Sequence, residues 1–252
     1  MTEMDEPRSP ETPPALPRVA ARLAAGLPLR ISAFGSSTTE GIGASSPSAS
    51  YPALLPAALA ALTGAGPAAI VANRGMGGET AVEMALRLPG ILAEDPDLLI
   101  WQTGSNDPLH GVPLARFAAL TRDGLRRARV AGIDVLLIEP QHAEQLVQHP
   151  QGVCFRDAVR TLGEAAGVPV VRRWDLMQHW LASGALTETE LHLGDGLHMA
   201  DGGYAMLAKA VARAILEGAG WLGREDSNLR MAESKSAALP LGDAPSAPPG
   251  AE

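Results

Sequence analysis

The 252-residue chain has a single cysteine, Cys154, so it cannot form an internal disulfide and carries no sign of an oxidising compartment. We expect Cys154 to be a small buried apolar side chain. The net charge of −8 disfavours nucleic acid and anionic membranes as partners. No apolar run reaches the ~18 residues of a membrane span, and arginines interrupt the apolar segment 19–30, so no secretion signal is indicated. We therefore expect a cytoplasmic protein.

Aromatic residues are also scarce, at 4%, which leaves little material for an extended platform on which sugar rings could stack. Apolar residues make up 46% and charged residues 19% of the chain, as in a globular protein with a sizeable core. Trp101 lies inside an apolar run and is expected to be part of this core. Trp174 and Trp180 are expected to pack one helix onto the sheet.

Both ends of the chain have the composition of tails. Residues 1–17 hold five prolines among charged residues, and residues 222–252 are polar and rich in proline and glycine. Such segments cannot bury enough apolar surface to fold. We predict a disordered arm over residues 1–25, one domain over residues 26–221 and a disordered tail over residues 222–252.

Between these ends, short apolar runs alternate with helical patterns. The apolar runs are continuous rather than alternating, which is typical of strands covered on both faces. The alternation of strands and helices predicts a parallel sheet with right-handed crossovers, in an α/β fold with three αβα layers and five strands. The expected strands are 29–34, 68–73, 98–102, 134–139 and 168–171, and the expected helices are 52–63, 80–88, 114–131, 155–166 and 202–217.

Glycine and small polar residues follow each of the first three predicted strands. The three segments read FGSSTTEG from Phe34, NRGMGGET from Asn73 and TGSND from Thr103. Ligands of open parallel sheets bind at the carboxyl ends of the strands. The sequence therefore predicts a site built from these loops. Late in the chain, the segment HLGDGLHM adds Asp195 and His198 just before a helical pattern.

These residue types are suited to acyl transfer. Ser37 offers a hydroxyl, His198 a base for its proton, and Asp195 an acceptor that can orient the imidazole. The backbone N–H groups of Ser37 and Gly78 and the side-chain amide of Asn106 are candidate donors to an oxyanion. The patterns STTE, from Ser37, and TAVE, from Thr80, are typical of capping boxes, so each predicts a helix start with free N–H groups beside the site.

In order and spacing, the blocks FGSSTTEG, NRGMGGET, GSND and DGLHMADGGY resemble the four signature blocks of the SGNH/GDSL hydrolase family, over roughly residues 30–217. The resemblance implies a flavodoxin-like sheet and hydrolysis of esters or thioesters without a metal ion or other cofactor. It implies Ser37 as nucleophile, Gly78 and Asn106 as oxyanion donors, and Asp195 and His198 as the acid and base.

The sequence departs from the family pattern at Ser36, where the family usually has Asp. That Asp is not a member of the catalytic triad, so the departure concerns the polarity of the pocket and the choice of substrate.

Other interpretations of the same residues stay open. Ser37 by itself could be a helix cap, and the second loop could be a phosphate-binding turn, although it lacks the full G-x-G-x-x-G spacing. His192, Asp195 and His198 could bind a metal ion and make a metal-dependent hydrolase. The same fold could also be a catalytically silent ligand-binding module. We favour a serine esterase that removes a small acyl group, such as acetyl, from a small-molecule ester.

Overall fold

A five-stranded, all-parallel sheet forms the centre of the computed structural model, which describes residues 14–64, 66 and 68–222. The strand order is β2-β1-β3-β4-β5, with each crossover made by a helix. The α/β fold predicted from the sequence is thereby confirmed. The strands are β1 (Leu29–Gly35), β2 (Ala69–Gly75), β3 (Leu98–Gln102), β4 (Asp134–Ile138) and β5 (Val170–Val171).

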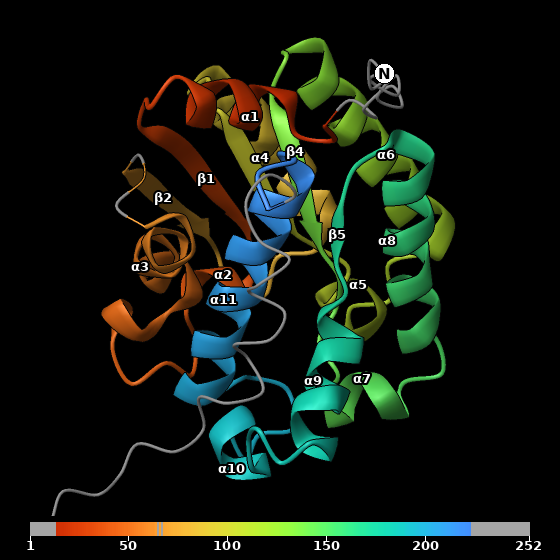
Figure 1. Ribbon diagram of the computed structural model, residues 1–252. Helices are drawn as coiled ribbons and strands as arrows, with labels where there is room; N and C mark the ends of the chain where they lie inside the picture. The colour runs from red at the N-terminus through yellow and green to blue at the C-terminus, as the bar shows by residue number, and fades with distance from the viewer. Residues whose placement is uncertain (1–13, 65, 67, 223–252) are drawn as a thin grey trace, which may run out of the picture. The chain divides into compact units, whose positions relative to one another are not determined.

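Two sets of long helices cover the two faces of the sheet (Figure 1). One set packs with β2 and β5 and consists of α3 (Tyr51–Thr63) and α11 (Asp201–Gly218). The other consists of α4 (Ala81–Ala93), α6 (Leu114–Val130) and α8 (Gly152–Ala166). In this set, α4 packs against α6, and α6 packs against α8. In the described part of the chain, no helix is both long enough and apolar enough to cross a membrane.

Shorter helices lie in the connections and at the start of the described chain. They are α1 (Pro17–Ala24), α2 (Ser37–Glu40), the 3₁₀ turn η1 (Pro47–Ala49), α5 (Asn106–Leu109), α7 (Glu144–Gln148), α9 (Arg173–Ala182) and α10 (Glu188–Leu191). Several of them follow the carboxyl ends of strands, where they shape the loops that the sequence marks as functional.

The main core lies between the sheet and the face formed by α4, α6 and α8. Because successive strand side chains point to opposite faces, Phe34 and Trp101 share this face and contact each other, with ring centroids 5.9 Å apart. Gly124 of α6 leaves room for the Trp101 ring, since a Cβ there would overlap it. Trp101 is buried, as predicted, and so are Trp174 and Trp180 of α9.

The prediction that every strand is covered on both faces is wrong for β2. This strand is at the edge of the sheet, and each of its residues is exposed or half-buried, with Ile70 60% exposed. An edge strand has a neighbouring strand on one side only, so more of its surface is open to solvent than in a central strand.

The prediction that the disordered arm extends to residue 25 is also wrong. Helix α1 begins at Pro17, and Leu16, Val19 and Leu23 are buried. The N–H of Leu16 donates to the carbonyl of Gly218 at 2.9 Å, which joins this segment to the end of α11. The folded domain therefore begins before residue 26. The remainder of the predicted arm, residues 1–13, and the tail from residue 223 lie outside the described residues.

Cys154 is exposed, which corrects the expectation that it is a buried apolar side chain. The buried face of α8 is formed by Phe155, Val159 and Leu162, spaced by four and three residues. Cys154 lies one residue before this series, so the turn of the helix points it away from the core.

Candidate active site

The loops that follow the first three strands meet at one edge of the sheet. Strand β1 lies between β2 and β3, and Gly35 pairs with Gly75 at the ends of β1 and β2. The predicted residues Ser37, Gly78 and Asn106 follow these strand ends in turn. Figure 1 shows α2 and α5, the helices that carry Ser37 and Asn106, at the same end of the sheet.

Ser37 is the first residue of α2, and it is recessed, with 7% of its surface exposed. The capping box predicted for Ser37–Glu40 is wrong, because Ser36 is the N-cap and its side chain makes no capping bond. In the described part of the chain, no hydrogen bond occupies the Ser37 hydroxyl or the Ser37 N–H. Both groups therefore remain available to a bound molecule.

Ser36 fixes the nucleophile loop to the end of β3. Its N–H and its hydroxyl both donate to Oε1 of Gln102, at 2.8 and 3.1 Å, and the Thr39 hydroxyl donates to the same oxygen at 3.3 Å. A serine suits this carbonyl oxygen because it supplies a second hydrogen, which an ionised Asp side chain does not have. This contact gives the departure at Ser36 a structural reason.

Glu40 joins the second loop to α2. Its Oε2 accepts the N–H of Gly77 at 2.6 Å, and the backbone approaches so closely that a Cβ on Gly75 would overlap the Glu40 nitrogen. A Cβ on Gly77 would lie 3.9 Å from Cβ of Ser37. Gly78 has a φ of 77°, a value that favours glycine, and its N–H has no partner among the described residues.

Asn106 and Asp107 join the third loop to the second. Nδ2 of Asn106 donates to the Glu79 carbonyl at 2.9 Å, which uses one of the two amide hydrogens. Oδ1 of Asp107 accepts the N–H of Ala81, at the start of α4, where the predicted capping box over residues 80–83 is confirmed. Burial raises the pKa of Asp107 to about 6, although the N–H of Ala81 favours its ionised form.

Asp195 and His198 are in direct contact. Oδ2 of Asp195 lies 2.6 Å from Nδ1 of His198, and Oδ1 accepts the N–H groups of Leu197 and His198 at 2.9 Å. Partial burial works against ionisation of Asp195, but these bonds outweigh it and lower the pKa to about 2. The carboxylate accepts a hydrogen from Nδ1 and therefore leaves Nε2 of His198 as the basic nitrogen.

The Asp195–His198 loop packs against the segment that follows α2. A Cβ on Gly43 would lie 3.4 Å from Cβ of His198, and the hydroxyl of Tyr204 donates to the Ile42 carbonyl at 2.6 Å. The loops of Ser37 and His198 are thus brought to the same region, although no hydrogen bond joins these two side chains in the described residues. Such contacts are often long when no substrate is bound.

The three side chains of the metal-binding alternative do not converge. Nδ1 of His192 lies 3.0 Å from a carboxylate oxygen of Glu188, and Nε2 lies 2.9 Å from the carbonyl of His142. Both ring nitrogens therefore face oxygens outside the Asp195–His198 pair. Over residues 14–64, 66 and 68–222, no group of three or more His, Cys, Asp or Glu side chains is arranged to hold a metal ion.

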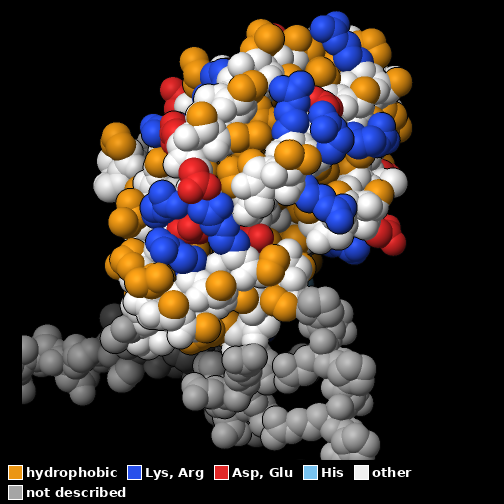
Figure 2. Space-filling view, turned by 90° about the horizontal axis from the view of Figure 1, so that it is seen from above, with side chains coloured by type: hydrophobic (Ala, Val, Ile, Leu, Met, Phe, Trp, Pro, Cys, Tyr) orange, Lys and Arg blue, Asp and Glu red, His pale blue; other side chains and the backbone are white. Residues whose placement is uncertain are grey.

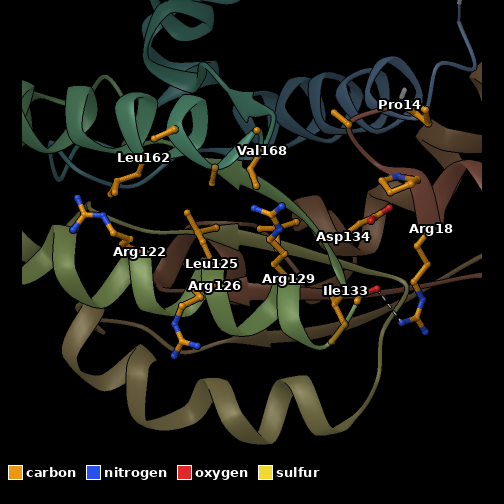
Figure 3. Close-up of a pocket in the computed structure, with 17 residues that line it drawn as sticks. Pro14, Arg18, Arg122, Leu125, Arg126, Arg129, Ile133, Asp134, Leu162 and Val168 are labelled. Atoms are coloured by element: carbon orange, nitrogen blue, oxygen red, sulfur yellow. Dashed lines mark hydrogen bonds between the residues drawn. The ribbon is translucent and has the colours of Figure 1, made fainter. Parts of the chain in front are cut away.

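One cavity lies away from these loops. It has a volume of about 840 Å³ and opens near the amino ends of β4 and β5, between α1, α6 and α8. Figure 2 shows this edge of the molecule, where Lys and Arg side chains gather, and Figure 3 shows Leu125, Arg129 and Val168 around the cavity. A second cavity, of about 360 Å³, adjoins the Asp195–His198 loop and includes His142, His192 and Gly196 in its lining.

A family model matches residues 7–220, and its family is described as Non-GDSL lipase-like. The chain belongs to this family. The family description agrees with the sequence, in which Ser36 replaces the Asp that is usual in the GDSL pattern. The resemblance to SGNH/GDSL hydrolases is confirmed at the level of the family, and the protein is placed among lipase-like ester hydrolases.

Solved structures show the same fold. A lipase/acylhydrolase from Enterococcus faecalis is 25% identical, with a TM-score of 0.64, and the match covers 74% of this chain and 95% of that one. The acetyl xylan esterase AlAXEase is 20% identical, with a TM-score of 0.62 and coverage of 74% and 99%. A two-domain esterase active on acetylated mannans is 20% identical, with a TM-score of 0.63 and coverage of 90% and 56%. No curated protein matches the chain.

Several polar residues around this site in the lipase-like protein were not found from the sequence. They are Gln102, Gln141 and Arg173, all buried beneath the loops that carry Ser37, Asn106 and His198. A signal for Gln102 exists in the sequence, because a glutamine ends the otherwise apolar run LLIWQ. Gln102 has one local partner, Ser105, but each of the three residues also has partners in distant parts of the chain, so these contacts depend on the tertiary structure.

Proposed function

We propose that this protein hydrolyses carboxylic esters with Ser37 as the nucleophile. Nε2 of His198 takes the hydroxyl proton as Ser37 Oγ bonds to the carbonyl carbon, and it then gives that proton to the leaving alcohol oxygen. The same nitrogen next takes a proton from the water that attacks the acyl-enzyme, and it returns that proton to Ser37 Oγ as the bond to the acyl carbon breaks and the carboxylic acid leaves. The observation that carries this proposal is the contact between Asp195 and His198, which leaves Nε2 free beside the loop of Ser37.

Three donors are proposed to stabilise the oxyanion of the tetrahedral intermediate. They are the N–H groups of Ser37 and Gly78 and the second amide hydrogen of Asn106. The support is that none of these hydrogens has an acceptor among the described residues. Donors that are fixed before the reaction need no reorganisation when the negative charge develops.

We propose a small acyl group, such as acetyl, on a small-molecule ester. Ser37 is recessed, and the backbone of Gly77 lies beside its Cβ, so the approach to the hydroxyl is narrow on this side. A series of p-nitrophenyl esters from acetate to decanoate measures this preference, and we expect kcat/KM to fall as the chain lengthens. The cytoplasmic location stays a prediction from the sequence.

An organophosphonate probe tests the nucleophile. We expect the probe to label the intact protein once, on the peptide that contains Ser37, and we expect Ser37→Ala to abolish both labelling and turnover of p-nitrophenyl acetate. Ser183→Ala, in an exposed turn after α9, is the control and should keep both. More than about a tenth of the wild-type turnover in folded Ser37→Ala would contradict the proposal. Absence of both labelling and turnover in the wild type would favour a silent binding module.

Chelation tests the metal-dependent alternative. Because both nitrogens of His192 face other oxygens, we expect EDTA to leave turnover unchanged. Loss of activity on chelation, with recovery on addition of Zn²⁺, would favour a metal-dependent hydrolase built on His192, Asp195 and His198.

A further inference from the structure

Among the described residues, no carboxylate forms an ion pair with the buried guanidinium of Arg173. This residue is 0% exposed at the start of α9, and burial lowers its pKa to about 10. Glu139, the carboxylate whose charge acts on Arg173, is hydrogen-bonded to Arg160 instead, at 2.6 and 2.8 Å. A buried charge is costly unless hydrogen bonds compensate for its lost hydration. The acceptors that Arg173 uses therefore indicate what it does.

Arg173 and these acceptors belong to four separate segments of the chain, because Glu139 and Gln141 share one. Nη1 donates to the hydroxyl of Thr38 at 2.9 Å, and Nη2 donates to Oε1 of Gln141 at 2.7 Å and to the hydroxyl of Ser105 at 3.4 Å. Nε donates to the carbonyl of Glu139 at 3.0 Å. The planar guanidinium fixes the directions of these bonds relative to one another.

Gln141 extends this set of contacts to a fifth segment. Its Oε1 accepts from Ser105 at 2.8 Å as well as from Arg173, and its Nε2 donates to the carbonyl of Leu197 at 3.2 Å. The amide needs both ends for these bonds, since only its oxygen accepts and only its nitrogen donates. Gln141 is itself buried, at the exit of β4.

Three of the contacted residues lie next to groups proposed to act in catalysis. Thr38 follows Ser37, Ser105 precedes Asn106, and Leu197 precedes His198. The five segments are far apart in the sequence, and the Arg173–Gln141 pair is bonded to all three loops that carry these groups.

We propose that Arg173 and Gln141 are positioning residues that set the placement of Ser37, Asn106 and His198 relative to one another. This inference rests on the proposed esterase function. The reacting atoms of a serine esterase must be aligned closely, and a displacement of about 1 Å can cost 10²-fold in rate. Both side chains are buried, so we expect no contact with the substrate, and the loss of either should lower kcat and leave KM nearly unchanged.

Substitutions at Gln141 give the cleanest test. Gln141→Glu keeps an acceptor for Arg173 but cannot donate to Leu197 when ionised, and Gln141→Leu removes both bonds. With p-nitrophenyl acetate, we expect kcat to fall about 10- to 100-fold in both variants, with KM within about threefold. We also expect faster hydrogen–deuterium exchange in the peptide that holds the Leu197 and His198 amides, both of which donate to Asp195.

Substitutions at Arg173 separate geometry from charge. We expect Arg173→Lys to resemble Arg173→Met, because a single ammonium group cannot reproduce the fork of the guanidinium. Arg160→Gln is the matched control, since Arg160 binds Glu139 and Asp175 and has no hydrogen bond to the three loops among the described residues. We expect this control to lose thermal stability and keep kcat when it is assayed well below its melting temperature.

The outcomes distinguish this inference from the proposed function. If the wild type shows no turnover that depends on Ser37, the proposed function fails, whatever the variants do. If the wild type is active and Gln141→Leu keeps its kcat and its exchange rates, the positioning inference is wrong. An equal fall of kcat in Arg160→Gln, or full activity in Arg173→Lys, would also overturn it.

Discussion

Oδ2 of Asp195 lies 2.6 Å from Nδ1 of His198, within a loop of four residues whose backbone N–H groups also bind the carboxylate. With a pKa of about 2, Asp195 is ionised at neutral pH. Burial works against this ionisation, and the hydrogen bonds from His198 and Leu197 outweigh it. The loop is therefore built to hold an anion against the imidazole.

The charge of Asp195 gives the first prediction. In Asp195→Asn, the side-chain oxygen can still accept the two N–H groups, but the amide presents hydrogens to Nδ1 and favours the wrong tautomer of His198. We expect kcat to fall by about 10⁴, as in a comparable triad, with the melting temperature nearly kept. Steady-state kinetics and circular dichroism measure the two quantities. A kcat within tenfold of the wild type would show that Asp195 is not a member of the proposed triad.

Asn106 gives the second prediction. Asn106→Ala removes the proposed oxyanion donor, so kcat should fall about 10²- to 10³-fold while KM changes less. The substitution also removes the bond to the Glu79 carbonyl. A lower melting temperature with an unchanged kcat would show that Asn106 only joins the two loops.

The third prediction concerns pH and Asp107. Burial, with a smaller contribution from the charge of Glu83, raises its pKa from 3.8 to about 6 in the folded state. The protonated form is therefore favoured by folding, and this stabilisation is present below pH 4 and lost as the pH rises through 6. Asp107→Asn cannot ionise but keeps an acceptor for the N–H of Ala81. Its free energy of unfolding relative to wild type should rise between pH 4 and 7, by on the order of 2–3 kcal/mol.

Denaturant unfolding at several pH values measures this difference. The free energy of unfolding of Asp107→Asn at any single pH does not test the prediction, because the amide and the carboxyl group have different interactions at every pH. Only the change with pH does. A difference that stays constant from pH 4 to 7 would show that Asp107 ionises at an ordinary pH despite its burial.

The fourth prediction concerns the segment before the predicted domain boundary. Leu16 is buried against the end of α11, where its side chain would contact a Cβ placed on Gly218. Leu16→Ala should lower the free energy of unfolding by about 2–5 kcal/mol. Leu27→Ala is the control, because Leu27 is 45% exposed and should change stability by less than about 0.5 kcal/mol. Equal stability of the two variants would show that α1 contributes little to the domain.

The sequence by itself determined the fold class and the residues that are candidates for chemistry. Continuous apolar runs separated by helical patterns predict a parallel sheet, because such strands are buried on both faces. The run 98–102 coincides with β3, and the other central strands differ by a residue or two at their ends. Four short blocks in order indicate the family, because a nucleophile, a base and small donor residues must follow particular strands. Local contact could also be predicted for Asp195 and His198, since both belong to one short loop.

Only the tertiary structure decided which distant groups support these residues. Helix α1 was missed because five prolines and several charges dominate the composition of the first 17 residues, while burial of Leu16 depends on the end of α11, about 200 residues away. Strand β2 is exposed because it lies at the edge of the sheet. An apolar run in the sequence does not distinguish an edge strand from a central one. Arg173 and Gln141 have no local pattern, because their partners belong to five segments that meet only in the folded chain. Hydrogen bonds between such segments depend on three-dimensional distance, and sequence spacing contains no measure of it.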